Sequence, residues 1–158
     1  MDDLRVGHGF DVHPIGEDQE RPLVLGGVQF DGPGLVGHSD ADVVAHACAD
    51  ALLGAAGQGD LGERFPDTDP SLAGADSLSL LADVVADLDT DGWEVCNVDC
   101  TVVLEEPRLT PHRAEMQRRL GEVVGAPVGV RGRRAESLGP VGRGEAVVCL
   151  AVALIRRR

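Results

Sequence analysis

Three side chains in the first third of the sequence could bind one divalent metal ion together. Asp11 and His13 are two residues apart, so they point to the same face if residues 5–13 form a strand, because side chains alternate along a strand. His46 lies in a later segment with helical periodicity. Histidine is the commonest nitrogen ligand for metals, and aspartate adds a hard oxygen. We therefore predict a three-ligand site that suits Zn²⁺ and leaves a fourth position open for substrate.

The segment that carries His46 is predicted to be a helix over residues 40–55. Ser39 and Asp42 have the spacing of a capping box at its start. Asp42, His46 and Asp50 recur every four residues and so form one stripe on this helix. We expect Asp50 to accept a hydrogen bond from the imidazole nitrogen of His46 that does not bind the metal, since such an outer partner orients the ligand.

The rest of the chain alternates between extended and helical patterns. A Gly-Gly turn between two apolar runs predicts a hairpin over residues 22–30. Glycines end the first helix and open a carboxylate-rich loop over residues 57–70. Further helices are predicted over residues 76–88 and, with Thr110 as N-cap, over residues 111–124. Further strands are predicted over residues 93–104, 127–131 and 145–155.

This order of elements predicts an α+β (mixed α/β) fold in which one sheet is covered by helices on one face. With 158 residues, the chain is predicted to form a single domain, residues 1–158, that is large enough to hold its own core. The other face of the sheet is left with valine-rich strands. We therefore expect other subunits to cover it.

The charge of the chain excludes some classes of partner. The formal net charge is −13 at pH 7, so no attraction to nucleic acid or to an anionic membrane surface is expected. The apolar run over residues 146–155 has half of the roughly 20 residues that a membrane helix needs, and a buried strand is the better interpretation. An anionic ligand must therefore be held locally, by a metal, by arginine or by backbone amides.

The cysteines indicate a reducing compartment. Cys48, Cys96, Cys100 and Cys149 lack C-x-x-C spacing, and the first residues lack a signal-peptide pattern. On a strand, Cys96 and Cys100 would be about 13 Å apart, which is too far for a disulfide. We predict buried free thiols and a cytoplasmic protein.

Several short motifs follow one another along almost the whole chain. They are Gly7-His8-Gly9-Phe10-Asp11-Val12-His13, Gly26-Gly27-Val28, His38-Ser39-Asp40-Ala41-Asp42-Val43, Gly59-Asp60-Leu61-Gly62, Phe65-Pro66-Asp67-Thr68-Asp69-Pro70, Pro111-His112 and Gly142-Arg143-Gly144-Glu145. In these motifs the chain resembles the 2-C-methyl-D-erythritol 2,4-cyclodiphosphate synthases of the non-mevalonate isoprenoid pathway.

The resemblance implies an enzyme, a phosphorus-oxygen lyase. Members of the family convert 4-diphosphocytidyl-2-C-methyl-D-erythritol 2-phosphate, a small-molecule nucleotide-diphosphate substrate, to the cyclic diphosphate and CMP. They are homotrimers with active sites between subunits. The resemblance also implies Zn²⁺ on Asp11, His13 and His46, and Mg²⁺ or Mn²⁺ held by Glu136 against the substrate diphosphate. Two ions would let a chain of this net charge bind a substrate with several negative charges.

The resemblance further implies roles for individual residues. His38 would stabilise the transition state, and Arg143 would lie near the trimer axis. The implied substrate-binding residues are Asp11, His13, His38 and Ser39; Asp60, Leu61, Gly62, Phe65, Pro66, Asp67, Thr68 and Asp69 around the methylerythritol part; Leu104, Glu105, Glu106, Pro107, Arg108, Leu109 and Thr110 around cytidine; and Arg133, Arg134, Glu136 and Arg143.

One segment departs from the family pattern. Family members have a run of threonines before a glutamate, whereas this chain has Arg133, Arg134 and Ala135 before Glu136. Position 134 corresponds to a threonine that stabilises the transition state, so Arg134 is the candidate second catalytic residue besides His38. Its guanidinium could donate charge-assisted hydrogen bonds to phosphate, or its bulk could block the pocket. Alternatively, the two arginines could be no more than a solvated basic face.

Two functions remain open from the sequence. The first is an active cyclodiphosphate synthase. The second is a zinc-binding trimeric paralogue that binds a diphosphate or isoprenoid ligand with weak or no turnover, because the threonines are replaced. Release of CMP from the diphosphocytidyl substrate distinguishes the two.

Overall fold

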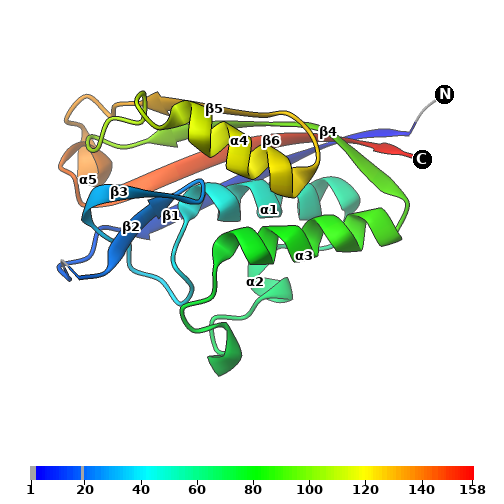
Figure 1. Cartoon of the computed structure of the whole chain (residues 1–158), viewed down its shortest axis with the longest axis horizontal. Coiled ribbons are helices and arrows are strands. Elements are labelled where there is room, and N and C mark those ends of the chain that lie inside the picture. The colour runs from blue at the N-terminus through cyan, green and yellow to red at the C-terminus, as the bar shows by residue number, and fades with distance from the viewer. Residues whose placement is uncertain (1–2, 19) are drawn as a thin grey trace.

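A four-stranded sheet runs the length of the molecule, and helices cover one of its faces (Figure 1). The computed structural model describes residues 3–18 and 20–158. Across the sheet the strands are β1 (Leu4–Pro14), β6 (Ala146–Arg157), β4 (Trp93–Val103) and β5 (Val128–Arg133). β6 is antiparallel to both β1 and β4, whereas β5 is parallel to β4. The predicted mixed α/β fold is confirmed.

Three longer helices pack against the sheet and against one another. They are α1 (Val43–Ala56), α3 (Ser77–Thr90) and α4 (Arg113–Val124). α1 contacts β1 and β6, and α4 connects β4 to the parallel β5. Two short helices and one 3₁₀ turn complete the chain: α2 (Leu61–Arg64), α5 (Gly139–Gly142) and η1 (Pro70–Leu72).

Two of the predicted helix starts are wrong. α1 begins at Val43, and its N-cap is Asp42 rather than Ser39, because the Asp42 carboxylate accepts hydrogen bonds from the second and third amides of the helix. α4 begins at Arg113 rather than at residue 111. The residues before it form a turn in which the His112 amide donates to the Leu109 carbonyl at 2.9 Å.

The hairpin of β2 (Pro22–Leu25) and β3 (Val28–Pro33) forms a second sheet of its own, so the prediction of one sheet is wrong in this respect. Its turn is held to α1 by Asp42. The buried Asp42 carboxylate accepts hydrogen bonds from the amides of Gly26 at 2.8 Å and Gly27 at 2.6 Å. The same side chain caps α1, so one carboxylate fixes the hairpin and the helix to each other.

Two glycines of β1 allow α1 to lie very close to the sheet. A Cβ atom at Gly7 would lie 1.9 Å from the backbone oxygen of Ala51, and one at Gly9 would lie 2.0 Å from that of Ala47. These contacts are far shorter than packed carbon atoms allow. Only glycine at these positions lets the helix that carries His46 rest against the strand that carries the other candidate ligands.

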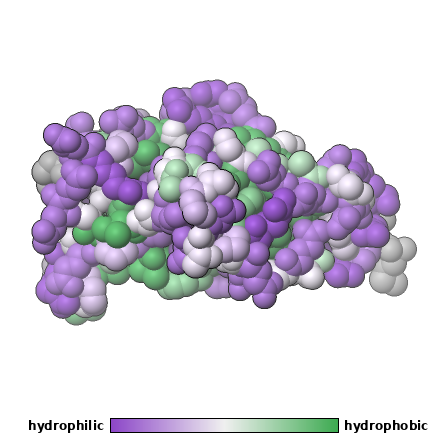
Figure 2. Space-filling view, turned by 90° about the horizontal axis from the view of Figure 1, so that it is seen from below, coloured by the Kyte–Doolittle hydropathy of each residue, from purple (hydrophilic) through white to green (hydrophobic). Residues whose placement is uncertain are grey.

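The face of the sheet that the helices leave open carries exposed hydrophobic side chains. Val6, Phe10 and Val12 of β1 and Val152 of β6 are 45–69% exposed. By contrast, the side of the molecule seen in Figure 2 is mainly hydrophilic, with smaller hydrophobic patches between the polar residues. Among the helices of residues 3–18 and 20–158, none has both the length and the hydrophobicity needed to cross a membrane.

The two ends of the described chain lie side by side at one end of the sheet (Figure 1). The Arg157 amide donates to the Asp3 carbonyl at 2.9 Å, where β1 starts and β6 finishes. At the opposite end of the sheet β1, β4 and β5 finish and β6 starts. The candidate site residues lie at this second end.

The four cysteines are free thiols, as predicted. Cys48, Cys100 and Cys149 are buried, and Cys96 is half-buried. The sulfur atoms of Cys48 and Cys100 are 3.3 Å apart in the core between α1 and β4. These side chains fill the core as small hydrophobic groups.

Candidate active site

Asp11, His13 and His46 converge where β1 meets the first turns of α1. Oδ2 of Asp11 is 3.0 Å from Nε2 of His13 and 3.0 Å from Nδ1 of His46, and the two nitrogens are 3.2 Å apart. Ligand atoms at about 2.0–2.1 Å from a tetrahedral zinc ion lie roughly 3.3 Å from one another. The three atoms are therefore spaced as one face of such a tetrahedron. We call these three residues the histidine cluster.

Both histidines of the cluster have their outer ring nitrogen fixed. Nδ1 of His13 donates to the Val36 carbonyl at 2.7 Å. Nε2 of His46 lies 2.8 Å from the hydroxyl of Ser77 and 3.1 Å from that of Ser39. With a proton on each outer nitrogen, Nε2 of His13 and Nδ1 of His46 keep the lone pair that a cation needs.

The outer partner of His46 differs from the predicted one. Asp50 instead accepts a hydrogen bond from the Leu61 amide at 3.3 Å. Ser77, at the start of α3, takes the place predicted for Asp50. Its hydroxyl donates to Asp40, which leaves the oxygen free to accept from His46. Sequence reasoning missed Ser77 because this contact joins positions 31 residues apart, and its position beside a predicted helix start is the only signal.

The histidine cluster stabilises positive charge. Burial alone would raise the pKa of Asp11, but hydrogen bonds from His13 and His46 outweigh burial and lower that pKa to about 2. Burial alone would lower the pKa of His13, but its hydrogen bond to Asp11 and the charge of Asp11 raise that pKa above its usual value. The ionised carboxylate therefore attracts a cation, for which protons compete.

A cavity of about 600 Å³ opens beside the histidine cluster. Besides the cluster itself, it is lined by Phe10, Asp50, Asp60, Leu61, Gly62, Phe65, Pro66 and Asp67. Asp60 caps α2 by accepting from the Glu63 amide at 2.8 Å. Thr68 and Asp69 continue the same loop. The structure thus brings most of the residues predicted to bind methylerythritol next to the predicted metal ligands.

His38 and Ser39 reach the same region from the loop before α1. Together with the cluster histidines they line a smaller cavity of about 120 Å³. Nε2 of His38 donates to the Asp69 carbonyl at 2.6 Å. Arg21, which sequence reasoning missed, donates to the carbonyls of Gly37 at 3.2 Å and Ser39 at 2.6 Å. Arg21 and Asp69 therefore hold the segment that presents His38.

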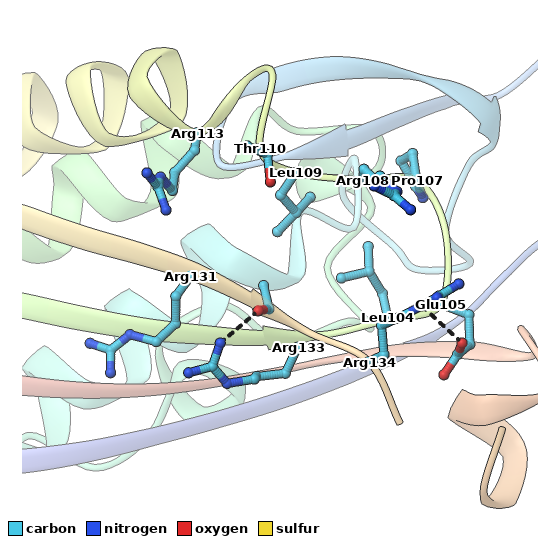
Figure 3. Close-up of a pocket in the computed structure, with 11 residues that line it drawn as sticks. Leu104, Glu105, Pro107, Arg108, Leu109, Thr110, Arg113, Arg131, Arg133 and Arg134 are labelled. Atoms are coloured by element: carbon cyan, nitrogen blue, oxygen red, sulfur yellow. Dashed lines mark hydrogen bonds and ion pairs between the residues drawn. The ribbon is translucent and has the colours of Figure 1, made fainter. Parts of the chain in front are cut away.

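A third cavity, of about 360 Å³, lies where β4 and β5 end (Figure 3). We call it the arginine cavity, because it is lined by Arg108, Arg113, Arg131, Arg133 and Arg134. The rest of its wall is Leu104, Glu105, Pro107, Leu109, Thr110 and Gly132. The segment predicted to bind cytidine thus lines this cavity, apart from Glu106. Arg131 and Arg133 extend in one direction from β5, and Arg113 faces them from the start of α4 (Figure 3).

The arginines of this cavity differ in their partners. Arg131 pairs with Asp99, and Arg134 lies 3.5 Å from Glu105 and 3.8 Å from Glu106. Within residues 3–18 and 20–158, no carboxylate lies within ion-pair distance of the remaining three, Arg108, Arg113 and Arg133. In a chain with 27 acidic residues against 14 basic ones, this concentrates uncompensated positive charge in one cavity. Sequence reasoning missed Arg113 and Arg131, although both lie within three residues of the predicted segments.

Glu136 and Arg143 lie in the segment after β5. Both are exposed, and Arg143 pairs with Glu145 at 2.6 Å. Glu136 does not belong to the histidine cluster. Three strand spacings, about 14 Å, separate β1 from β5, and the arginine cavity shares no lining residue with the cavities beside the cluster.

Comparison with known families identifies the family of this chain. A sequence model described as the YgbB family matches residues 4–156, nearly the whole chain. The chain belongs to the YgbB family. The 2-C-methyl-D-erythritol 2,4-cyclodiphosphate synthase of Synechococcus elongatus is 48% identical to it, over 99% of each chain. The resemblance inferred from the motifs is confirmed.

Solved structures of related proteins share the fold of this YgbB family member. The bifunctional IspDF from Campylobacter jejuni matches with a TM-score of 0.94 and 37% identity, over 100% of this chain and 43% of that one. IspF from Plasmodium falciparum, solved as a CDP complex, matches with a TM-score of 0.85 and 29% identity, over 98% and 97%. The chain therefore spans less than half of the bifunctional protein and nearly all of the single-function one.

Proposed function

We propose that this YgbB family member cyclises 4-diphosphocytidyl-2-C-methyl-D-erythritol 2-phosphate to 2-C-methyl-D-erythritol 2,4-cyclodiphosphate and releases CMP, in isoprenoid precursor biosynthesis. An oxygen of the 2-phosphate attacks the phosphorus attached to methylerythritol, and the bond from that phosphorus to CMP breaks. The observation that carries the proposal is that the histidine cluster and the arginine cavity lie at the same end of the sheet. The names of the relatives support the same activity.

In this proposal the histidine cluster holds Zn²⁺. Its spacing fits one face of a tetrahedron, and both histidines have their outer nitrogens occupied. A zinc ion there would orient a substrate phosphate and neutralise part of its charge. His38, fixed by the Asp69 carbonyl, would stabilise the transition state. Ser39 and the loop of residues 60–69 would hold the phosphate and methylerythritol parts.

The arginine cavity would hold the cytidine diphosphate part. The P. falciparum relative was solved with CDP, which supports a nucleotide ligand. Leu104 and Leu109 supply apolar surface for a base, and Arg108, Arg113 and Arg133 supply cations without carboxylate partners. Guanidinium groups of this kind bind phosphate through charge-assisted hydrogen bonds. Arg134 would stabilise the transition state in place of the family threonine.

Glu136 would hold a second divalent ion, Mg²⁺ or Mn²⁺, against the substrate diphosphate. Its side chain is exposed and belongs to the same loop as Arg134. Most of the rate of an intramolecular phosphoryl transfer comes from positioning and from neutralising charge. The residues of this chain therefore need only to bind, orient and exclude water from the reacting groups.

We further propose a homotrimer with active sites between subunits. The open face of the sheet exposes Phe10, Val12 and Val152, and such a face is normally covered in an assembly. The separation of the histidine cluster from the arginine cavity across one chain fits a site that joins the cluster of one subunit to the arginine cavity of the next. Arg143 would lie near the trimer axis.

We place the enzyme in the cytoplasm, where free thiols persist. All four cysteines are unpaired, which is typical of a reducing compartment. The net charge of −13 makes nucleic acid an improbable partner on electrostatic grounds. The proposed partners are therefore the nucleotide substrate and further copies of this chain.

The test is turnover of the diphosphocytidyl substrate by purified protein with Zn²⁺ and Mg²⁺. We expect release of CMP together with a cyclic diphosphate in the phosphorus NMR spectrum. Binding of CDP without release of CMP would overturn the proposal and revive the weakly active paralogue, which the full-length similarity to named synthases does not favour.

A further inference from the structure

Glu105 lines the arginine cavity, but its carboxylate oxygens contact other groups of the protein. Its side chain is only 16% exposed. Oε1 accepts hydrogen bonds from the Ala135 amide at 2.9 Å and the Ser137 amide at 3.4 Å. Oε2 lies 3.5 Å from Nε of Arg134, an ion pair drawn in Figure 3. One carboxylate from the loop after β4 thus contacts three groups of the loop after β5, the Arg134 side chain and the amides of Ala135 and Ser137.

The residue between the two anchored amides is Glu136, the proposed ligand of the second ion. Glu136 and Ser137 both have left-handed backbone conformations, with φ of 53° and 61°. Residues with a side chain other than Asn or Asp rarely adopt this conformation, and two in succession persist only when the surroundings impose it. The Leu138 amide closes this turn on the Ala135 carbonyl at 2.9 Å. Glu105 is the side chain that holds it from outside, because its carboxylate accepts from the amides of Ala135 and Ser137, the residues on either side of Glu136.

We propose that Glu105 is a positioning residue, which sets the direction of Glu136 by holding the turn of residues 135–137. It does not touch substrate in this role. The inference rests on the proposed function, because it assigns Glu136 to a divalent ion beside the nucleotide. This role explains why an acidic side chain lies in a cavity proposed to bind an anion, since both carboxylate oxygens of Glu105 face donors of the protein itself.

The test compares Glu105→Ala with Glu105→Gln. A glutamine carbonyl can still accept from both amides, whereas alanine cannot, so the glutamine variant is the rescue. The first readout is hydrogen exchange of the Ala135 and Ser137 amides, which reports the turn directly. The second is the affinity for Mn²⁺, measured by its electron paramagnetic resonance signal with CDP present. Glu122→Ala, which removes an exposed glutamate paired with Arg118 on α4, is the control for lost charge.

We expect Glu105→Ala to speed exchange of both amides and to weaken Mn²⁺ binding about tenfold or more, as loss of an outer partner usually does. Glu105→Gln should recover Mn²⁺ affinity to within about threefold, because it loses only the contact to Arg134. If Glu105→Ala matches Glu122→Ala, or if glutamine gives no recovery, the role of Glu105 is overturned. If the unchanged protein binds neither CDP nor Mn²⁺, the proposed function fails instead, and the amide exchange still decides whether Glu105 holds the turn.

Discussion

The histidine cluster and the arginine cavity occupy the same end of one sheet but are built in opposite ways. The cluster lies on a strand and a helix that close packing at Gly7 and Gly9 presses together, and its three donor atoms are 3.0–3.2 Å apart. The arginine cavity is lined mainly by loop and strand-end residues with long, exposed side chains. Rigid elements suit a metal site, which tolerates little error, whereas mobile guanidinium groups can adapt to a phosphate.

The difference fits the expectation that the sequence keeps the family pattern at the histidine cluster and departs from it beside the arginine cavity. At the histidine cluster one side chain cannot move without disturbing the other two. At the arginine cavity, Arg134 stands where the family resemblance predicts a threonine, and it pairs with Glu105 and Glu106. An open loop accepts such a change, because the longer side chain extends toward solvent instead of into packed neighbours.

The largest effect is expected from His13→Ala, which removes one corner of the cluster. We expect loss of zinc and a fall in CMP release of at least about 100-fold, because a bound metal supplies several kcal/mol of charge stabilisation. Metal content by atomic emission and the rate of CMP release measure the two effects. His112→Ala, an exposed histidine that contacts Phe30, is the control for metal content. If the His13→Ala variant retained all of its metal, the histidine cluster would not be the metal site on which the comparison rests.

Gly9→Ala tests whether close packing creates the rigid half. The new Cβ would lie 2.0 Å from the Ala47 carbonyl oxygen, and such overpacking costs about 1–3 kcal/mol or more of unfolding free energy. Urea denaturation measures this loss, and weaker zinc binding should accompany it. Gly54→Ala is the matched control, because a Cβ at that helical position would meet only the His8 carbonyl oxygen, at an ordinary contact distance of 3.8 Å, and alanine should stabilise it by about 0.5–1 kcal/mol. Equal stability of the two variants would contradict the packing argument.

Arg134→Ala tests the adaptable half. We expect kcat to fall about tenfold, which corresponds to the loss of one charge-assisted hydrogen bond, while zinc content and unfolding free energy stay unchanged. Arg134→Thr should restore part of the rate, since a hydroxyl can donate to the same phosphate. Arg158→Ala, at the far end of the sheet, controls for the change in net charge. An Arg134→Ala variant with full kcat would show that this arginine is only a solvated side chain.

The smallest effect is expected at an arginine–glutamate group outside both regions. Hydrogen bonds from Arg118 and Arg119 lower the pKa of the exposed Glu115 to about 2. A depressed carboxyl pKa stabilises the fold above pH 4.5 and loses that contribution as the pH falls from 4.5 toward 2. Because salt screens exposed pairs, Glu115→Gln should barely change the melting temperature at pH 7. A large change there would mean that surface pairs, and not buried contacts, stabilise this chain.

Much of the histidine cluster could be predicted from sequence because its rule is local. A spacing of two on a strand places Asp11 and His13 on one face, whatever the rest of the fold does. The outer partner could not be predicted in this way. Asp50 fits the helical stripe of His46, but Ser77 reaches the nitrogen from another helix, and only tertiary packing decides between them.

The same limit applies to the fold and to the arginine cavity. The hairpin was predicted from its Gly-Gly turn, but its separation from the main sheet depends on Asp42, which ties that turn to α1. Likewise, Arg113 and Arg131 join the cavity from different elements, one of them at the start of α4 and the other on β5. Local sequence patterns predict which segments form helices and strands, whereas long-range contacts determine which of these elements lie next to one another.

The side-by-side ends of the chain have a practical consequence. Any polypeptide attached at either end starts beside the point where β1 starts and β6 finishes, at the end of the sheet opposite the histidine cluster and the arginine cavity. An affinity tag or a second catalytic unit can therefore be joined there without shielding the entrance for substrate.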